Sequence, residues 1–226
     1  MADAPVLTID GPSGSGKGTV ARRVAETLGW RLLDSGALYR ILGLAAERAG
    51  VSLEDEKGLA ELARGLEIGF ESRPGEEGVR VLLGGEDVSR EIRTESAGDR
   101  ASRVARWPAV REALLERQRD FAGPPGLVAD GRDMGTVVFP GACCKVYLTA
   151  SAEERARRRH KQLKEKGLNV SIQTLCREIA ERDRRDAERS VAPLRPAPDA
   201  VVIDSTGVTI DQVVDRVLAV VRERLS

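Results

Sequence analysis

The sequence predicts an α/β fold in which helices flank a parallel β-sheet. Its first apolar segment, 6–10, is followed by a glycine-rich loop over 11–19 and then by a helical pattern, which is the order of a β-α-β unit. Three further short apolar segments are typical of strands, namely 127–130, 145–149 and 200–204, and helical patterns separate the last two. The 226 residues suffice for one such domain with an inserted subdomain, or for two small domains.

The first β-α-β unit is complete soon after the loop. A helix is expected over 20–28, where Gly29 ends it, and a short strand over 30–33. The next helix is expected over 36–48, because apolar residues there fall on one face: Leu38, Ile41, Leu42, Leu44 and Ala45.

The middle of the chain has a different pattern. β-like runs at 66–71 and 79–83 flank a turn-rich segment, which predicts an antiparallel insert with a third short strand or irregular edge over 84–92. Helical periodicity resumes over 95–106 and, after a Trp-Pro pair, over 109–121. More helices are expected towards the C-terminus: 152–166, 171–189 and 210–225.

The loop after the first strand has the composition of a phosphate site. It contains Gly11, Pro12, Ser13, Gly14, Ser15, Gly16, Lys17, Gly18 and Thr19. Glycines let backbone N–H groups curl around an anion, and Lys17 adds a mobile charge for β- and γ-phosphate oxygens. We therefore interpret the loop as a nucleoside triphosphate site, the alternative being a simple Gly/Ser turn. Because Gly18 stands where Ser or Thr usually follows the lysine, the direct protein ligand of Mg²⁺ is left open.

Composition and charge exclude several classes of partner. Lys and Arg total 36, as do Asp and Glu, and this zero net charge argues against a nucleic-acid coat or an anionic-membrane binder. Cys143, Cys144 and Cys176 cannot form a complete disulfide framework. No stretch of about 18 uncharged apolar residues occurs either. We expect a cytoplasmic protein with no nucleic-acid or membrane partner.

Polar residues follow two of the predicted strands. Asp130 ends the strand over 127–130 and resembles a Walker B aspartate, at the sheet edge where the glycine loop also lies. A turn or helix cap is the alternative for Asp130, and Ser35, after the second strand, has the alternative role of a helix N-cap.

Two charge-dense helices near the C-terminus carry arginines on shared faces. Arg155 and Arg159 are spaced i, i+4, and Arg182, Asp186 and Arg189 are spaced i, i+4, i+7. Such a face is either a solvated surface with intrahelical ion pairs or part of a lid that closes over phosphates.

Four motifs together resemble the P-loop nucleoside monophosphate kinases, and among them the bacterial cytidylate kinase family. The resemblance runs almost end to end and is carried by 11–19, 33–40, 130–136 and 181–189. The Asp-Gly-Arg-Asp-Met-Gly-Thr run at 130–136 is the most specific motif, since many kinases share the glycine loop. The resemblance implies a five-stranded parallel sheet, an antiparallel insert that binds the monophosphate and a helical lid. Its boundaries would be 1–64, 106–150 and 190–226 for the core, 65–105 for the insert and 151–189 for the lid region.

The resemblance also implies ATP-dependent phosphorylation of CMP and dCMP by a monomer, with Mg²⁺ accompanying ATP. Lys17, Arg132 and Arg189 would be catalytic, and Asp130 would be an outer-shell partner of Mg²⁺. ATP would be bound by the whole loop, 11–19, with Arg155 and Arg159. CMP would be bound by Ser35, Arg40, Ser102, Arg111, Arg132, Asp133, Arg182, Asp186 and Arg189.

Two other functions stay open on the sequence. A P-loop kinase for another small acceptor, such as shikimate or dephospho-coenzyme A, is disfavoured by the antiparallel insert and by the run at 130–136. A nucleotide-dependent switch that binds a partner protein is disfavoured because the sequence has no Asn-Lys-x-Asp guanine-recognition run.

Overall fold

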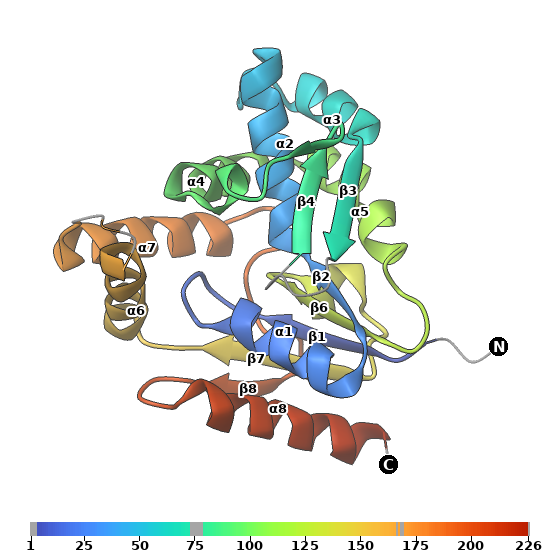
Figure 1. The fold of residues 1–226 in the computed structure, drawn as a ribbon, viewed down its shortest axis with the longest axis vertical. Coiled ribbons are helices and arrows are strands. Elements are labelled where there is room, and N and C mark those ends of the chain that lie inside the picture. Colours follow the sequence, from blue (N-terminus) through green and yellow to red (C-terminus); the bar gives the residue numbers. More distant parts are fainter. Residues whose placement is uncertain (1–3, 73–78, 166, 168–169, 226) are drawn as a thin grey trace. The chain divides into compact units, whose positions relative to one another are not determined.

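The computed structural model describes residues 4–72, 79–165, 167 and 170–225 (Figure 1). They form two compact units: the first contains Met1–Asp34 and Gln118–Ser226, and the second contains Ser35–Arg117. The predicted insert, 65–105, lies within the second unit, and the predicted lid region, 151–189, lies within the first. Among the described helices, none combines the length and apolarity that a membrane span requires.

The first unit is built on a five-stranded parallel sheet, as predicted. Its strands follow the order β2 (Arg31–Asp34), β6 (Leu127–Gly131), β1 (Val6–Asp10), β7 (Cys144–Thr149) and β8 (Val201–Asp204). All neighbouring pairs are parallel, and the central strand β1 pairs with β6 on one side and β7 on the other. The segments that follow β1, β2 and β6 therefore leave the sheet at the same edge, which is where open parallel sheets bind ligands.

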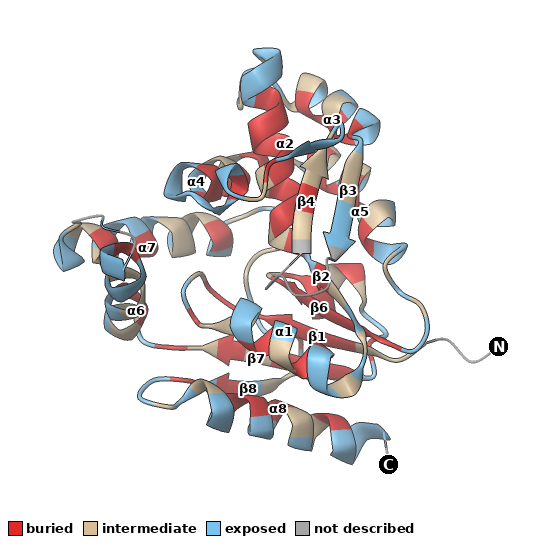
Figure 2. Cartoon of the chain, viewed as in Figure 1, coloured by how far each residue is buried: buried red, intermediate tan, exposed pale blue. Residues whose placement is uncertain are grey.

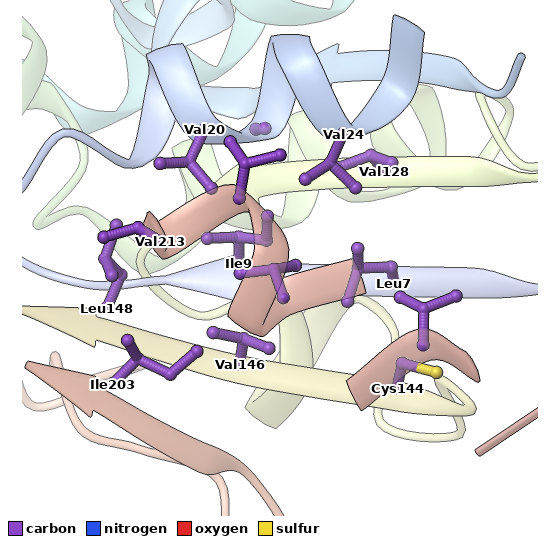
Figure 3. Packing of buried hydrophobic residues seen from close by; sticks show 14 of the residues in the cluster. Leu7, Ile9, Val20, Val24, Val128, Cys144, Val146, Leu148, Ile203 and Val213 are labelled. Atoms are coloured by element: carbon purple, nitrogen blue, oxygen red, sulfur yellow. The ribbon is translucent and has the colours of Figure 1, made fainter. Parts of the chain in front are cut away.

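Helices α1 (Lys17–Leu28) and α8 (Ile210–Leu225) pack together against one face of this sheet (Figures 1 and 3). Aliphatic side chains fill the space between them, including Ile9 of β1, Val20 of α1 and Val213 of α8. Burying each such side chain stabilises the fold by about 1.5–3 kcal/mol. Helix α1 begins three residues before the predicted start and ends at Gly29, as predicted.

Helices α6 (Ala152–Glu165) and α7 (Ile172–Ala187) form a hairpin in the first unit. They pack through a small apolar cluster, and Figure 2 shows that much of their remaining surface is exposed. Ser171 caps α7, since its Oγ accepts from the Thr174 N–H at 3.1 Å. Helix α7 ends two residues earlier than predicted, so Arg189 lies beyond it. The predicted end of the first helix of the pair, Lys166, is outside the described residues.

The second unit contains the antiparallel sheet that the sequence predicts. Strands β3 (Ile68–Ser72), β4 (Val79–Leu83) and β5 (Glu86–Asp87) form it, and helix α2 (Ser35–Ala49) packs on it. A short 3-10 turn, η1 (Glu91–Arg93), follows β5. The expected third strand over 84–92 is thus only two residues long, because the chain turns to bury Val88 and Ile92 against α2.

Three more helices complete the second unit: α3 (Glu56–Gly65), α4 (Glu95–Val104) and α5 (Pro108–Arg119), the last of which extends two residues past the unit's boundary. Helix α3 was not predicted. Asp55 caps it by accepting from the Gly58 N–H at 3.0 Å, and Leu59, Ala60 and Ala63 are its buried residues. Helices α4 and α5 each end two residues before their predicted ends.

Candidate active site

The glycine loop (11–19) leads from β1 into the N-terminus of α1. A Cβ atom at Gly11 would lie 2.0 Å from the carbonyl oxygen of Leu148 in β7, so only glycine lets the chain leave the sheet here. Gly16 has a left-handed backbone, with φ of 88°, and within the described residues no side chain caps α1. Uncapped N–H groups at the positive end of a helix are what an anion site requires.

Lys17 lies in a crowded, positively charged environment. Its Nζ donates to the carbonyl oxygen of Pro12 at 3.3 Å. The pKa of Lys17 is lowered to about 7, first by burial and then by the charges of Arg132 and Arg182, against the opposing effect of Asp130. An anion placed among these cations would restore the charged form of the lysine, because an opposite charge raises its pKa.

Asp130 explains why glycine follows the lysine. A Cβ atom at Gly18 would lie 3.2 Å from Oδ2 of Asp130, closer than most Cβ contacts in proteins. The carboxylate therefore occupies the space beside the first turn of α1, next to the position where a hydroxyl residue is usual. Asp130 also pairs in register with Asp34, so two carboxylates stand at the ends of neighbouring strands.

Arg132 and Arg189 form a charge cluster around the buried Asp186. Arg132 Nε donates to Asp186 Oδ2 at 3.0 Å, and Arg189 Nη2 pairs with Asp186 Oδ1. Arg132 Nη1 also donates to the carbonyl oxygen of Gly11 at 2.7 Å, which ties the cluster to the glycine loop. Burial acts to raise the pKa of Asp186, but the attraction of Arg132, Arg189 and Arg182 outweighs it and the pKa is lowered. Three arginines around one carboxylate leave a positive excess that suits a phosphate.

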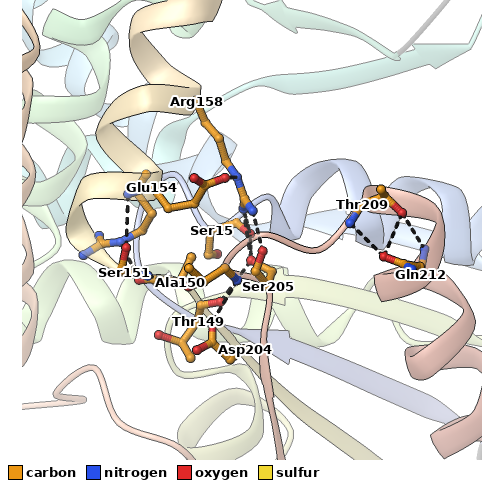
Figure 4. A network of polar contacts seen from close by, with 12 residues as sticks. Ser15, Thr149, Ala150, Ser151, Glu154, Arg158, Asp204, Ser205, Thr209 and Gln212 are labelled. Carbon is orange, nitrogen blue, oxygen red and sulfur yellow. Dashed lines mark hydrogen bonds and ion pairs between the residues drawn. The ribbon is translucent and has the colours of Figure 1, made fainter.

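The arginines of α6 contact the outside of the glycine loop. Arg155, which is 5% exposed, donates through Nη1 to the carbonyl oxygen of Ser13 at 3.1 Å and pairs with Asp183 of α7 at 2.6 Å. Arg158 donates to the carbonyl oxygen of Ser15 at 3.2 Å (Figure 4). Arg159, predicted as the partner of Arg155, instead donates to Gln162 within the same helix at 3.0 Å.

The second unit holds four of the predicted residues, namely Ser35, Arg40, Ser102 and Arg111. Ser35 is buried at the first position of α2, and Ser102 is buried in the last turn of α4. Arg111 of α5 donates to the carbonyl oxygen of Ala105, just after α4, at 3.2 Å, and its guanidinium lies over the Tyr39 ring. Within this unit the structure thus brings Arg111 to the end of α4 that carries Ser102.

Arg40 is half-buried in α2, and among the described residues its Nε meets no hydrogen-bond acceptor. A buried guanidinium nitrogen without an acceptor costs free energy unless an anion or water satisfies it. Arg40 is therefore suited to binding an anion that the protein does not itself provide.

Asp10 was not predicted from the sequence. Its side chain holds the segment that follows Arg132 and Asp133 by two hydrogen bonds from the backbone. It is 3% exposed and accepts the backbone N–H groups of Met134 and Gly135, both at 2.8 Å. These residues begin η2 (Met134–Val138), a single π-helical turn after β6. Burial, followed by the like charges of Asp133 and Asp130, raises the pKa of Asp10 to about 7 even though the two N–H groups lower it.

Replacing Asp10 with asparagine should change how stability depends on pH. Because the folded protein holds the Asp10 proton up to about pH 7, against 3.8 for an ordinary aspartate, wild-type stability falls as pH rises through this window. The asparagine side chain has no such transition, although its NH₂ group must face one of the two backbone donors, at a cost of about 1–3 kcal/mol. Urea unfolding of both proteins at pH 5 and pH 8 measures this effect. If the difference in free energy of unfolding between wild type and variant were the same at both pH values, the raised pKa of Asp10 would be contradicted.

A family model described as cytidylate kinase matches residues 7–223 of the chain. The chain belongs to the cytidylate kinase family. A cytidylate kinase of Pseudomonas syringae pv. tomato is 61% identical over 216 residues, which cover 96% of this chain and 94% of that protein. A cytidylate kinase of Methylococcus capsulatus is 61% identical over 218 residues, covering 96% and 97%. A solved gluconokinase structure from Sinorhizobium meliloti is similar with a TM-score of 0.49 and 19% identity, over 97% of this chain and 93% of that one.

In the described part of the chain, no group of three His, Cys, Asp or Glu side chains is placed to hold a metal ion. Mg²⁺ keeps several waters and usually binds through one or two carboxylates together with substrate phosphates. Asp130, which lies beside Gly18 of the glycine loop, and its register partner Asp34 fit an ion that arrives with a nucleotide.

Some of the residues that the structure brings together were predicted from the sequence. The structure brings Arg132, Asp186 and Arg189 together with the start of the glycine loop. It adds three residues that were not predicted, namely Asp10, Arg158 and Asp183. Arg158 lies on the same helical face as Arg155 by its i, i+3 spacing, but Arg159 does so too by its i, i+4 spacing, so the pattern alone does not select Arg158.

Proposed function

We propose that this chain transfers the γ-phosphoryl group of ATP to CMP and dCMP, which yields ADP and CDP or dCDP. Membership of the cytidylate kinase family over residues 7–223 carries the proposal. The glycine loop with Lys17, and the arginines around Asp186, supply the chemistry that such a transfer needs. Two polyanions must be held in line while their charge is neutralised, and no covalent protein intermediate is required.

The acceptor needs no strong general base. The second pKa of a monophosphate is about 6, so its oxygens are already mostly ionised at neutral pH. Positioning is therefore the main task, and Lys17 would hold the transferring phosphate while Arg40, Arg132 and Arg189 hold the acceptor phosphate. Arg155 and Arg159 would serve the ATP side, where Arg155 already contacts the glycine loop.

Mg²⁺ with ATP is part of the proposal. The ion would supply positive charge at the ATP phosphates, and Asp130 would hold its water ligands from the end of β6. Gly18 keeps the space for this carboxylate, as its close approach to Asp130 Oδ2 indicates.

Recognition of cytosine would rest on Ser102, Arg111 and Asp186, with Arg182 and Asp186 at the ribose and Ser35 and Asp133 nearby. Cytosine presents an amino donor where uracil presents an acceptor, so a carboxylate distinguishes the two bases. Ser102, Arg111 and Asp186 are all buried, and buried polar groups left without partners can reject the wrong ligand by about 10⁴-fold.

We also propose that the core (1–64, 106–150 and 190–226) binds ATP, that 65–105 contributes to the monophosphate site, and that 151–189 acts as a lid. The small apolar cluster between α6 and α7 and their exposed surface are typical of a locally mobile element. We infer a monomer in the cytoplasm; the three free cysteines are consistent with a reducing compartment.

A panel of acceptors tests the function. ADP release coupled to NADH oxidation should be fast with CMP and dCMP and slow with UMP, AMP and GMP. A preference for AMP or GMP would overturn the substrate assignment, and tight ATP binding without acceptor-dependent ADP release would favour a regulatory switch.

Replacing Arg189 with alanine tests whether this residue serves the acceptor CMP and not the nucleotide donor. The variant should lose CMP turnover by about 10²-fold or more, since a charge-assisted bond to the acceptor phosphate is removed, while its affinity for ADP stays within about twofold. Arg184→Ala is the matched control, because Arg184 is exposed on α7. An equal loss of ADP affinity and CMP turnover in Arg189→Ala would contradict this placement.

A further inference from the structure

Two distant residues meet at one carbonyl group of the glycine loop. Arg158 Nη1 of α6 and Ser205 Oγ, just after β8, each donate to the carbonyl oxygen of Ser15 at 3.2 Å (Figure 4). Arg158 Nη1 also donates to Ser205 Oγ at 3.0 Å, and Nη2 donates to the Ser205 carbonyl oxygen at 2.5 Å. The two side chains and the Ser15 carbonyl thus form one connected group.

Both side chains are held in place by other contacts. Arg158 Nε pairs with Glu154 Oε1, one turn earlier in α6, at 2.9 Å. Ser205 is 2% exposed, and its backbone N–H donates to the Thr149 carbonyl oxygen at 2.9 Å. The single hydroxyl proton of Ser205 is shared between two acceptors, because Oγ also lies 3.0 Å from the Thr149 carbonyl oxygen. The planar guanidinium is therefore fixed at both edges, which a flexible lysine could not reproduce.

Fixing the Ser15 carbonyl also fixes the N–H of Gly16. A trans peptide is planar, and its C=O and N–H point in opposite directions. Arg158 and Ser205 hold the oxygen on the outside of the loop, so the Gly16 N–H of the same peptide points the other way. Arg155 has the same effect on the peptide between Ser13 and Gly14, two residues earlier. Its contact with the Ser13 carbonyl oxygen sets the direction of the Gly14 N–H.

We propose that Arg158 and Ser205 are positioning residues for ATP, which hold the Ser15 carbonyl so that the Gly16 N–H is oriented towards the nucleotide phosphates. Neither side chain needs to touch ATP. Because Arg158 belongs to α6, the same contact couples the helical hairpin to the glycine loop. This inference rests on the proposed function only for the identity of the nucleotide.

ADP binding by calorimetry, without an acceptor, tests the inference separately from kinase activity. Arg158→Gln should weaken ADP affinity about tenfold and Ser205→Ala about three- to tenfold, as expected for one or two lost hydrogen bonds. The double variant should lose less than the product of the two effects, because both residues act on one carbonyl. Arg157→Gln, an exposed neighbour with the same loss of charge, should bind ADP as the wild type does.

The conservative variant separates positioning from direct contact. Arg158→Lys keeps the positive charge but not the planar set of N–H donors, so its affinity for ADP should remain as low as that of Arg158→Gln. The KM for CMP should be unchanged in all variants. If Arg158→Lys restores ADP affinity while Ser205→Ala has no effect, Arg158 binds phosphate directly and the inference is wrong. Loss of thermal stability in Arg158→Gln with normal ADP affinity would also overturn it. Should Arg158→Gln fail to fold, Ser205→Ala and Arg158→Lys still decide. Absence of CMP-dependent ADP release in the wild type would count against the proposed function alone.

Discussion

Replacing Lys17 with methionine should lower kcat/KM about 10²–10³-fold with every acceptor, because the preorganised charge that we propose for the transferring phosphate is lost. The effect should not depend on the base of the acceptor, since Lys17 lies on the glycine loop, which we propose binds ATP. Lys57→Met, on the exposed surface of α3, is the matched control and should leave kcat/KM unchanged.

The same substitution should stabilise the protein when no nucleotide is bound. Folding lowers the pKa of Lys17 from 10.5 to about 7, so the unfolded chain binds this proton more tightly than the folded protein. The cost of holding a charged lysine is therefore fully present below pH 7 and disappears as pH rises towards 10.5. Methionine removes the cost, so the advantage of the variant is greatest at pH 6.

Thermal unfolding at pH 6 and pH 9, with and without MgATP, measures both effects. Without nucleotide, Lys17→Met should have the higher Tm at pH 6, and its advantage should shrink at pH 9. With MgATP the order should reverse, because the wild type gains the larger ligand stabilisation. A lower Tm for the variant at pH 6 without nucleotide would mean that the bond from Nζ to the Pro12 carbonyl oxygen outweighs the crowding of charges.

The sheet and the glycine loop could be predicted because local patterns determine them. Short apolar segments gave all five strands of the parallel sheet to within a residue or two. Their common direction then places Gly11 and Arg132 at one sheet edge, where the structure shows their hydrogen bond. Helix α3 was missed because its amphipathic segment is short, although Asp55 and Gly58 form a recognisable cap.

The contacts of the α6 arginines could not be predicted from spacing. Arg158 and Arg159 are both one turn from Arg155, so periodicity does not distinguish them. Ser205, 47 residues further along the chain, decides which of them contacts the glycine loop. Asp10 was missed for a similar reason, because its partners are the N–H groups of Met134 and Gly135 on a neighbouring segment, and backbone donors leave no mark in a sequence.

Replacing Asp186 with asparagine should have the largest effect on stability. Asp186 is 1% exposed and is the shared counter-ion of Arg132 and Arg189. Asparagine can accept from one guanidinium, but its NH₂ group must then face the other. Breaking a buried ion pair in this way costs about 3–5 kcal/mol, which corresponds to a fall in Tm of about 10 °C for a protein of this size. Asp211→Asn is the control, since its pair with Arg23 at 2.6 Å is exposed and should be worth under about 1 kcal/mol.

The stability difference between wild type and Asp186→Asn should depend on pH in one direction. The pKa of Asp186 is lowered on folding, so its contribution is fully present above the ordinary value of 3.8 and is lost as pH falls through the folded value. Chemical unfolding should therefore show a constant difference between pH 5 and pH 8 that shrinks below pH 4. A difference that grew on acidification would mean that burial, not the arginines, controls this carboxyl group.

Phosphate ion should partly rescue the asparagine variant. With the carboxylate gone, Arg132 and Arg189 keep their charges without their shared counter-ion, and a phosphate can take its place because both guanidinium groups bind planar or tetrahedral oxyanions well. Inorganic phosphate should thus raise the Tm of Asp186→Asn by more than it raises the Tm of the wild type or of Asp211→Asn. Equal shifts in all three proteins would show that these arginines do not bind phosphate, and would remove the structural support for their role at the acceptor.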